Sequence, residues 1–99
     1  MAKKPETIFK EKVLEELREI KNSYWIKVHQ VAIKGIPDIL GSVNGRFIAL
    51  ELKKDEKEKA DKLQEYVLHE IDKAGGIALV AYPTNFDEIK HYIVKQTSF

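Results

Sequence analysis

The chain has 99 residues, no cysteine, and 17 basic against 16 acidic side chains. This length predicts one domain over residues 1-99, and the absence of cysteine excludes disulfides and thiolate metal sites. A net charge of +1 gives no overall preference for nucleic acid, so a DNA-binding surface would have to be local. Because there is neither a bilayer-length apolar run nor a signal-peptide core, we expect a cytoplasmic protein without membrane contact.

The N-terminal stretch from Pro5 to Ile20 is predicted to be a helix, since proline suits the first helical turn and apolar residues recur with helical period. Glu6 falls within the apolar stripe. Its carboxylate either lies at the solvated helix start, where the helix dipole favours it, or points into a site. The stripe consists of Phe9, Val13, Leu17 and Ile20.

The next segment, Tyr24 to Ile33, is rich in aromatic and β-branched residues and is predicted to be a strand. Strand alternation places His29 on the same face as Trp25. A single histidine in a strand is either structural or close to a bound phosphate, and the sequence leaves both alternatives open. Lys34 then leads into the following hairpin.

Asn44 and Gly45 separate two apolar runs, which is the strongest short-range indication of a β-hairpin closed by a type I′ turn. This turn fixes the register of the two strands. Counting outward from it places Asp38 opposite Glu51, with Lys53 on the face of Glu51. The pairs nearer the turn are Val43 with Arg46 and Leu40 with Ala49.

Two carboxylates opposed across a sheet repel each other, so the pair of Asp38 and Glu51 needs compensation. A divalent cation such as Mg²⁺ would provide it, because this ion binds through one or two carboxylates, water and substrate phosphate. Alternatively, Lys53 and water neutralise the acids at a frayed end of the sheet.

The C-terminal half is predicted to contain a helix from about Glu58 to Ala74, a strand from Ile77 to Tyr82 that pairs in parallel, and a last helix. Gln64 lies on the apolar face of the first of these helices, where a buried amide needs hydrogen-bond partners. The buried residues of that face are expected to be Ala60, Val67, Leu68 and Ile71. The charged run Lys54 to Lys59 is expected to be solvated, and Asn85 with Glu88 predicts a capping box for a helix that ends near Lys95.

Pro37-Asp38 and Glu51-Leu52-Lys53 resemble the active-site motif of the PD-(D/E)XK nuclease superfamily. The order of elements is similar to the αβββαβ restriction-endonuclease-like core of that superfamily, an α/β fold with a mixed central sheet flanked by helices, here followed by a C-terminal helix. The motif, the order of elements and Gln64 together resemble the small stand-alone VRR-type nucleases of phages and prophages. This resemblance covers about residues 5 to 83.

The resemblance implies a role for each matching residue. Asp38, Glu51 and the Leu52 carbonyl would bind Mg²⁺ or Mn²⁺, Lys53 would be the catalytic lysine, and Gln64 would support the site. Glu6 is the expected acid of the first helix, although Glu11 also matches the spacing found in related resolvases. The expected phosphate contacts are Lys3, Lys4 and Lys10 on the first helix and Lys34 beside the site.

The function implied is metal-dependent hydrolysis of phosphodiester bonds by a DNA endonuclease that acts on branched or double-stranded DNA, as Holliday-junction resolvases do. We expect a homodimer, because a second copy doubles the basic contacts and places two sites about a two-fold axis. If the protein is phage-encoded, it would work in the host cytoplasm. The alternatives are a catalytically silent DNA-binding accessory module and a small α/β interaction protein.

Overall fold

The structure is a computed structural model that describes residues 2–29 and 33–99. The order of elements is helix, three strands, helix, strand, helix, which confirms the predicted order and makes the chain an α/β protein. The elements are α1 (Pro5–Leu17), β1 (Ser23–Lys27), β2 (Ile39–Val43), β3 (Arg46–Leu52), α2 (Lys62–Lys73), β4 (Ile77–Ala81) and α3 (Phe86–Thr97). None of the helices in the described ranges is long and apolar enough to cross a bilayer.

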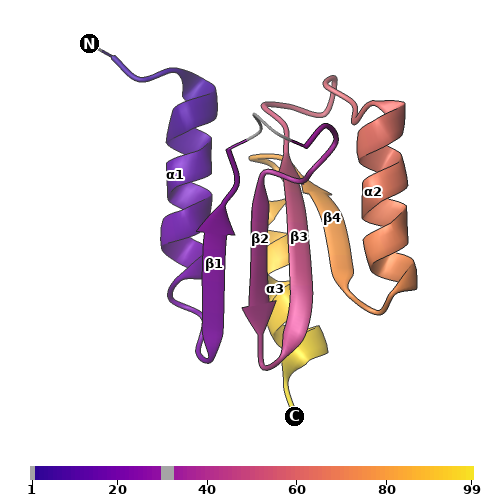
Figure 1. Cartoon of the computed structure of the whole chain (residues 1–99). Helices are drawn as coiled ribbons and strands as arrows, with labels where there is room; N and C mark the ends of the chain where they lie inside the picture. Colours follow the sequence, from indigo (N-terminus) through magenta and orange to yellow (C-terminus); the bar gives the residue numbers. More distant parts are fainter. Residues whose placement is uncertain (1, 30–32) are drawn as a thin grey trace.

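The four strands form one mixed sheet in the order β1-β2-β3-β4 (Figure 1). The first three strands are antiparallel, and β4 pairs with β3 in parallel, as predicted. Asn44 and Gly45 have φ angles of 50° and 85°, and these positive values are those that a type I′ turn requires. The predicted hairpin register is confirmed, with Val43 opposite Arg46 and Leu40 opposite Ala49.

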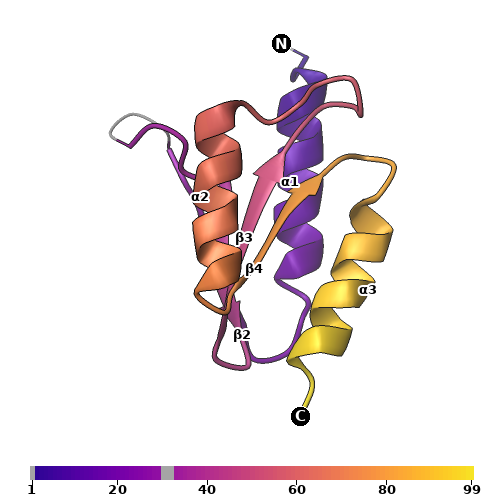
Figure 2. The same ribbon diagram turned by 90° about the vertical axis from the view of Figure 1, so that its right-hand side faces the viewer.

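The helices cover the two faces of the sheet unequally, since α1 and α3 lie on one face and α2 on the other (Figure 2). The main core lies between the sheet and the pair α1 and α3. There the rings of Phe9 and Phe86 meet edge to face, with centroids 6.3 Å apart. Other fully buried members of this core are Val13, Leu17, Ile39, Ile48, Leu50 and Ile93.

The sheet face that carries α2 is only partly covered, because none of the described helices lies over β1 and β2 on this side (Figure 1). Tyr24 is 70% exposed and Ile26 is 50% exposed, whereas Trp25 between them is buried on the opposite face. Phe47 on β3 and Tyr66 on α2 are also exposed. We call Tyr24, Ile26, Phe47 and Tyr66 the open face.

Two N-terminal elements are shorter than the sequence predicts. Helix α1 ends at Leu17, and Ile20 only packs against the core from outside the helix. Strand β1 ends at Lys27 instead of Ile33. The backbone N–H of Val28 still donates to the Asp38 carbonyl at 2.8 Å, just before β2 begins, and among the described residues this is the last bond between the two segments. Residues 30–32 of the predicted strand lie outside the described residues.

The helix boundaries in the C-terminal half also differ from the prediction. Helix α2 begins at Lys62, with Asp61 as its N-cap, so Ala60 precedes the helix and is only partly buried. The predicted capping box at Asn85 is wrong. The Asn85 side chain accepts a hydrogen bond from the Tyr82 backbone at 2.6 Å, and within the described residues it makes no capping bond to α3. Helix α3 continues to Thr97, beyond the predicted end near Lys95.

Candidate functional site

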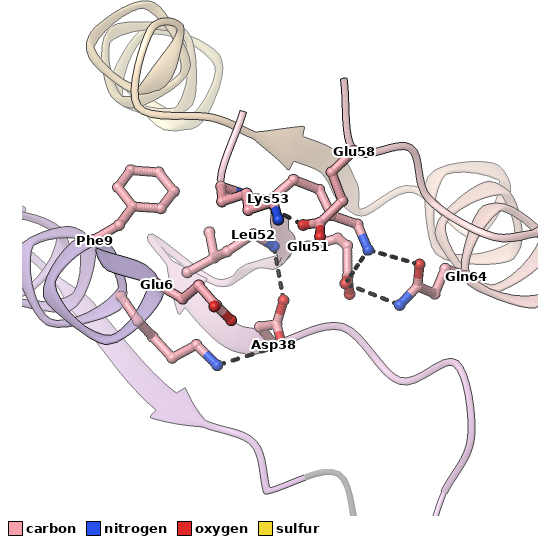
Figure 3. A pocket seen from close by; sticks show the side chains of 10 residues that line it. Glu6, Phe9, Asp38, Glu51, Leu52, Lys53, Glu58 and Gln64 are labelled. Carbon is pink, nitrogen blue, oxygen red and sulfur yellow. Dashed lines mark hydrogen bonds and ion pairs between the residues drawn. The ribbon is translucent and has the colours of Figure 1, made fainter. Parts of the chain in front are cut away.

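A pocket of about 220 Å³ lies at the C-terminal end of β3, beside the first turns of α1 and the start of α2 (Figure 3). It brings together the five residues predicted to be catalytic. Figure 3 shows the Glu6 carboxylate, from α1, turned toward Asp38. The five residues are Glu6, Asp38, Glu51, Lys53 and Gln64, and Leu52 and Lys10 also line the pocket.

Asp38 stands directly before β2 and is 8% exposed. Its Oδ2 accepts a hydrogen bond from the Leu52 backbone N–H at 2.8 Å, which ties the start of β2 to the end of β3. The Lys10 ammonium of α1 lies 3.7 Å from Oδ1. The described strand pairing stops at Ile39 opposite Leu50, so Asp38 comes next to Glu51 by extension of the register that the turn predicts.

Glu51 is 2% exposed, which is unusual for a carboxylate. Its Oε2 accepts a hydrogen bond from Gln64 Nε2 at 3.0 Å and lies 3.5 Å from the Lys53 ammonium. Its Oε1 is buried and has no hydrogen-bond donor among the described residues. A buried oxygen without a donor is costly, so this atom is a natural ligand for a cation.

The surroundings of Glu51 raise its pKa from the ordinary value of 4.5 to about 7. Burial is the largest cause, because it disfavours the charged carboxylate, and the neighbouring Asp38 acts in the same direction. Lys53 opposes both effects without cancelling them. The charged form of Glu51 is therefore disfavoured in the folded protein, although Lys53 lies beside it.

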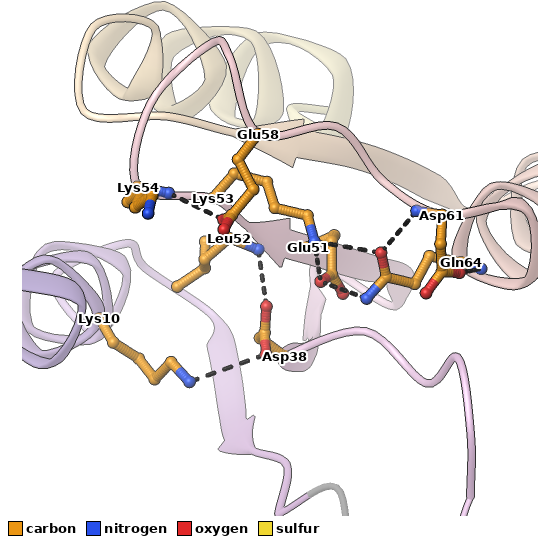
Figure 4. A network of polar contacts seen from close by, with 9 residues as sticks. All are labelled: Lys10, Asp38, Glu51, Leu52, Lys53, Lys54, Glu58, Asp61 and Gln64. Carbon is orange, nitrogen blue, oxygen red and sulfur yellow. Dashed lines mark hydrogen bonds and ion pairs between the residues drawn. The ribbon is translucent and has the colours of Figure 1, made fainter.

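Gln64 joins Glu51 and Lys53 to the first turn of α2 (Figure 4). Its Oε1 accepts hydrogen bonds from the Lys53 ammonium at 3.1 Å and from the Asp61 backbone N–H at 2.9 Å. Asp61 returns the contact, since its Oδ1 accepts from the Gln64 backbone N–H at 2.8 Å. The pair Asp61 and Gln64 is thus a capping box. An acid three residues before a glutamine is the sequence pattern of such a box, and this one was not predicted.

The donor set fits a hard divalent cation. Asp38 and Glu51 supply carboxylate oxygens, Glu51 Oε1 lacks a donor, and Leu52, the source of the third expected ligand, lines the pocket. Within residues 2–29 and 33–99, no group of three or more His, Cys, Asp or Glu side chains is close enough to hold a metal ion. A cation bound here would thus complete its coordination with water and phosphate oxygens, as Mg²⁺ commonly does.

The remaining acid and histidine candidates lie outside the pocket. Glu11 forms an ion pair with Lys3 at 2.9 Å, so Glu6 is the glutamate that α1 directs to the site. His29 is exposed. Glu58 lines the pocket although the charged run was expected to be solvated, and its Oε1 accepts from the Lys54 backbone N–H at 3.3 Å.

Of the four expected phosphate contacts, Lys10 alone lines the pocket. Lys3 and Lys4 precede α1, which begins at Pro5, so their predicted place on the helix is wrong. Lys34 is exposed and lies outside the pocket.

The chemistry available in the pocket is that of the adjacent acids Asp38 and Glu51 and of Lys53, with the amide of Gln64 bound to Glu51 and Lys53. This set can hold a cation and stabilise negative charge on a phosphoryl group. Comparison of the chain with models of known protein families, with characterised proteins and with solved structures found no significant match.

Proposed function

We propose that the protein is a Mg²⁺- or Mn²⁺-dependent DNA endonuclease of the PD-(D/E)XK type, similar to the VRR nucleases. The observation that carries the proposal is the buried pair of Asp38 and Glu51 with Lys53 beside it in one pocket. A pair of buried acids destabilises a fold unless positive charge compensates it, and a cation would add to the charge that Lys53 and Lys10 supply. The order of the elements and the motif residues support the same assignment.

Asp38, Glu51 and the Leu52 carbonyl would hold the cation. When bound, this ion supplies a water of lowered pKa and neutralises charge that develops on the phosphate. The Lys53 ammonium is held by Gln64 Oε1 and by Glu51, so it is positioned to hydrogen-bond the attacking water or the phosphoryl oxygens. Gln64 fixes the direction of both side chains through its two ends.

The proposed substrate is branched or double-stranded DNA, and the proposed working form is a homodimer. A silent DNA-binding module would have no need to keep Asp38, Glu51 and Lys53 together. An interaction protein would gain nothing from burying Glu51 with an oxygen that lacks a donor. Both alternatives make different predictions for metal and DNA, so one set of experiments distinguishes all three.

The proposal is tested by incubating the protein with linear, nicked, flapped and four-way DNA, with and without Mg²⁺ or Mn²⁺. We expect cleavage only with metal, and more of it on branched DNA. Glu51→Gln should abolish cleavage and weaken Mn²⁺ binding in calorimetry. Lys53→Ala should still bind Mn²⁺ and lose turnover by about two orders of magnitude or more. The control is Glu65→Gln, an exposed carboxylate on the first turn of α2.

The outcomes separate the candidates. DNA binding without metal-dependent cleavage would indicate the accessory module. Failure to bind either DNA or metal would indicate the interaction protein. Cleavage by Glu51→Gln at the wild-type rate would overturn the site assignment.

A further inference from the structure

Each of the two acids in the pocket faces its own lysine, and the two lysines are held differently. Lys53 lies 3.5 Å from Glu51 and is also bound by Gln64, and its side chain is 11% exposed. Lys10 lies 3.7 Å from Asp38, and its side chain is 30% exposed. In the described part of the chain, this contact is the one ion pair or hydrogen bond of the Lys10 ammonium. Lys53 is therefore held by two partners, and the more exposed Lys10 by one.

A divalent cation and the Lys10 ammonium compete for the same carboxylate. An ion coordinated by Asp38 would lie about 2 Å from an oxygen of that carboxylate, so the two positive charges would be within a few ångströms of each other. Repulsion at this range is strong where the surroundings are partly buried. Lys10 can relieve it, because a flexible four-carbon stem on a helix surface allows the ammonium to swing away.

We propose that Lys10 is a displaceable counter-ion of the acid pair, which neutralises Asp38 in the metal-free protein and leaves when a divalent cation binds. This inference rests on the metal-dependent function proposed above. It explains how a site with two adjacent carboxylates folds before metal arrives. It also makes Lys10 a residue that lowers metal affinity, although its charge suits phosphate. After displacement, the ammonium remains at the edge of the pocket, within reach of a phosphate bound to the cation.

The test is calorimetric titration of Mn²⁺ into wild type and into Lys10→Met, which keeps an unbranched side chain of similar length and removes the charge. We expect the Mn²⁺ dissociation constant of Lys10→Met to fall roughly five- to tenfold, the effect of losing one partly screened charge. The increase in melting temperature on adding Mn²⁺ should also be larger than in wild type. Lys10→Arg keeps the charge and should bind Mn²⁺ as wild type does.

The matched control is Lys12→Met. Lys12 is on the same helix, pairs with Glu16 at 3.9 Å, and has a side chain that is 61% exposed, so this change should leave Mn²⁺ affinity unaltered. A second measurement uses the unaltered chain. In carbon-13 NMR, the Lys10 Cε signal should sharpen and shift on adding Mg²⁺, as its ammonium leaves Asp38, whereas the Lys12 signal should not change.

Unchanged or weaker Mn²⁺ binding by Lys10→Met, while the wild type binds Mn²⁺, would overturn the inference and leave the proposed function intact. A Lys10 Cε signal unaffected by saturating Mg²⁺ would overturn it in the same way. If the wild type binds no divalent cation, the proposed function fails, and this inference fails with it.

Discussion

Glu51 carries a charge that its surroundings disfavour. Its pKa is about 7 in the folded protein, against an ordinary value of 4.5, chiefly because of burial and then because of Asp38. Between these two pH values the folded state binds more protons than the unfolded state. The free energy of unfolding therefore falls as the pH rises through this window, and it is highest, as far as Glu51 is concerned, below pH 4.5.

The fall of the free energy of unfolding with rising pH gives a stability prediction for Glu51→Gln in metal-free buffer. At pH 8 the variant should melt above wild type by roughly 5 °C, the shift that about 1 kcal/mol produces in a domain of this size. The side-chain amide of the variant keeps a polar group beside Gln64, and it can donate a hydrogen bond to Asp38. The gain should shrink toward pH 5, where Glu51 of the wild type is protonated.

The measurement is thermal unfolding, followed by circular dichroism with a chelator present, at pH 5 and pH 8. Glu65→Gln is the control, because this exposed side chain lies outside the pocket. A variant that melts below wild type at pH 8 would contradict the view that burial and Asp38 make the charged Glu51 carboxylate unfavourable.

The two acids of the site could be predicted because a two-residue turn and strand alternation determine which side chains are neighbours. The contacts of Lys10 with Asp38 and of Asp61 with Gln64 could not be predicted from the sequence. The pairing of Lys10 with Asp38 depends on how α1 docks against the sheet. The capping role of Asp61 was hidden in a charged run that also fits a solvated loop.

At the scale of elements, the central strand β2 depends on having no side chain at Gly41. This glycine is opposite Trp25 in the strand register. A Cβ placed there would lie 2.3 Å from Trp25 Cε3 and 2.6 Å from the Tyr24 carbonyl oxygen. The indole therefore packs directly on the backbone of β2, and this contact holds β1 against β2.

Gly41→Ala should lower the free energy of unfolding by about 2 to 3 kcal/mol, since both the indole and a backbone carbonyl would have to move. Urea denaturation measures this change. Ser42→Ala is the control, because Ser42 is only partly buried and lies on the other face of the strand; its effect should stay within about 0.5 kcal/mol. An alanine at position 41 with an unchanged urea midpoint would mean that Trp25 does not pack as described.

The hairpin was the best predicted element because its turn sequence has few alternative conformations. The ends of β1 and α2 were predicted poorly for a different reason. Hydrophobic pattern continues past Lys27, but the strand ends where its ladder with β2 ends. Helical pattern begins near Glu58, but the helix begins where Asp61 caps it.

At the scale of the whole molecule, the predicted homodimer has a candidate interface in the open face. Its four side chains expose on the order of 500 Å² of largely apolar surface, most of the roughly 800 Å² that each partner contributes to a typical interface. None of the four carries a charge, which favours a protein surface over a phosphate backbone as the occupant. A second copy, related by a two-fold axis, is the occupant that we expect.

Light scattering at micromolar concentration should therefore give a dimer for the wild type and a monomer for Tyr24→Lys, because a buried lysine without a partner is strongly unfavourable at an interface. Tyr92→Lys is the control, since Tyr92 is 46% exposed but lies on α3, outside the open face. A wild type that stays monomeric, with and without a four-way junction, would contradict both the interface and the dimer.

The sequence predicted the order of helices and strands but not which face of the sheet each helix covers. That distribution depends on how the connections cross the sheet and on which apolar stripe docks where. Because α1 and α2 lie on opposite faces of the sheet, α2 contributes Gln64 to the pocket from one side, and α1 contributes Glu6 and Lys10 from the other.

The capping box of α2 has a consequence for how the site responds to warming. Gln64 holds Glu51 and Lys53 with the same side-chain amide that closes the first turn of the helix with Asp61. Helix ends open locally at a smaller free energy than a central strand such as β3. When this turn frays, Glu51 and Lys53 lose a shared partner while the sheet stays paired. We therefore expect the pocket to lose its geometry at a lower temperature than the chain loses its fold.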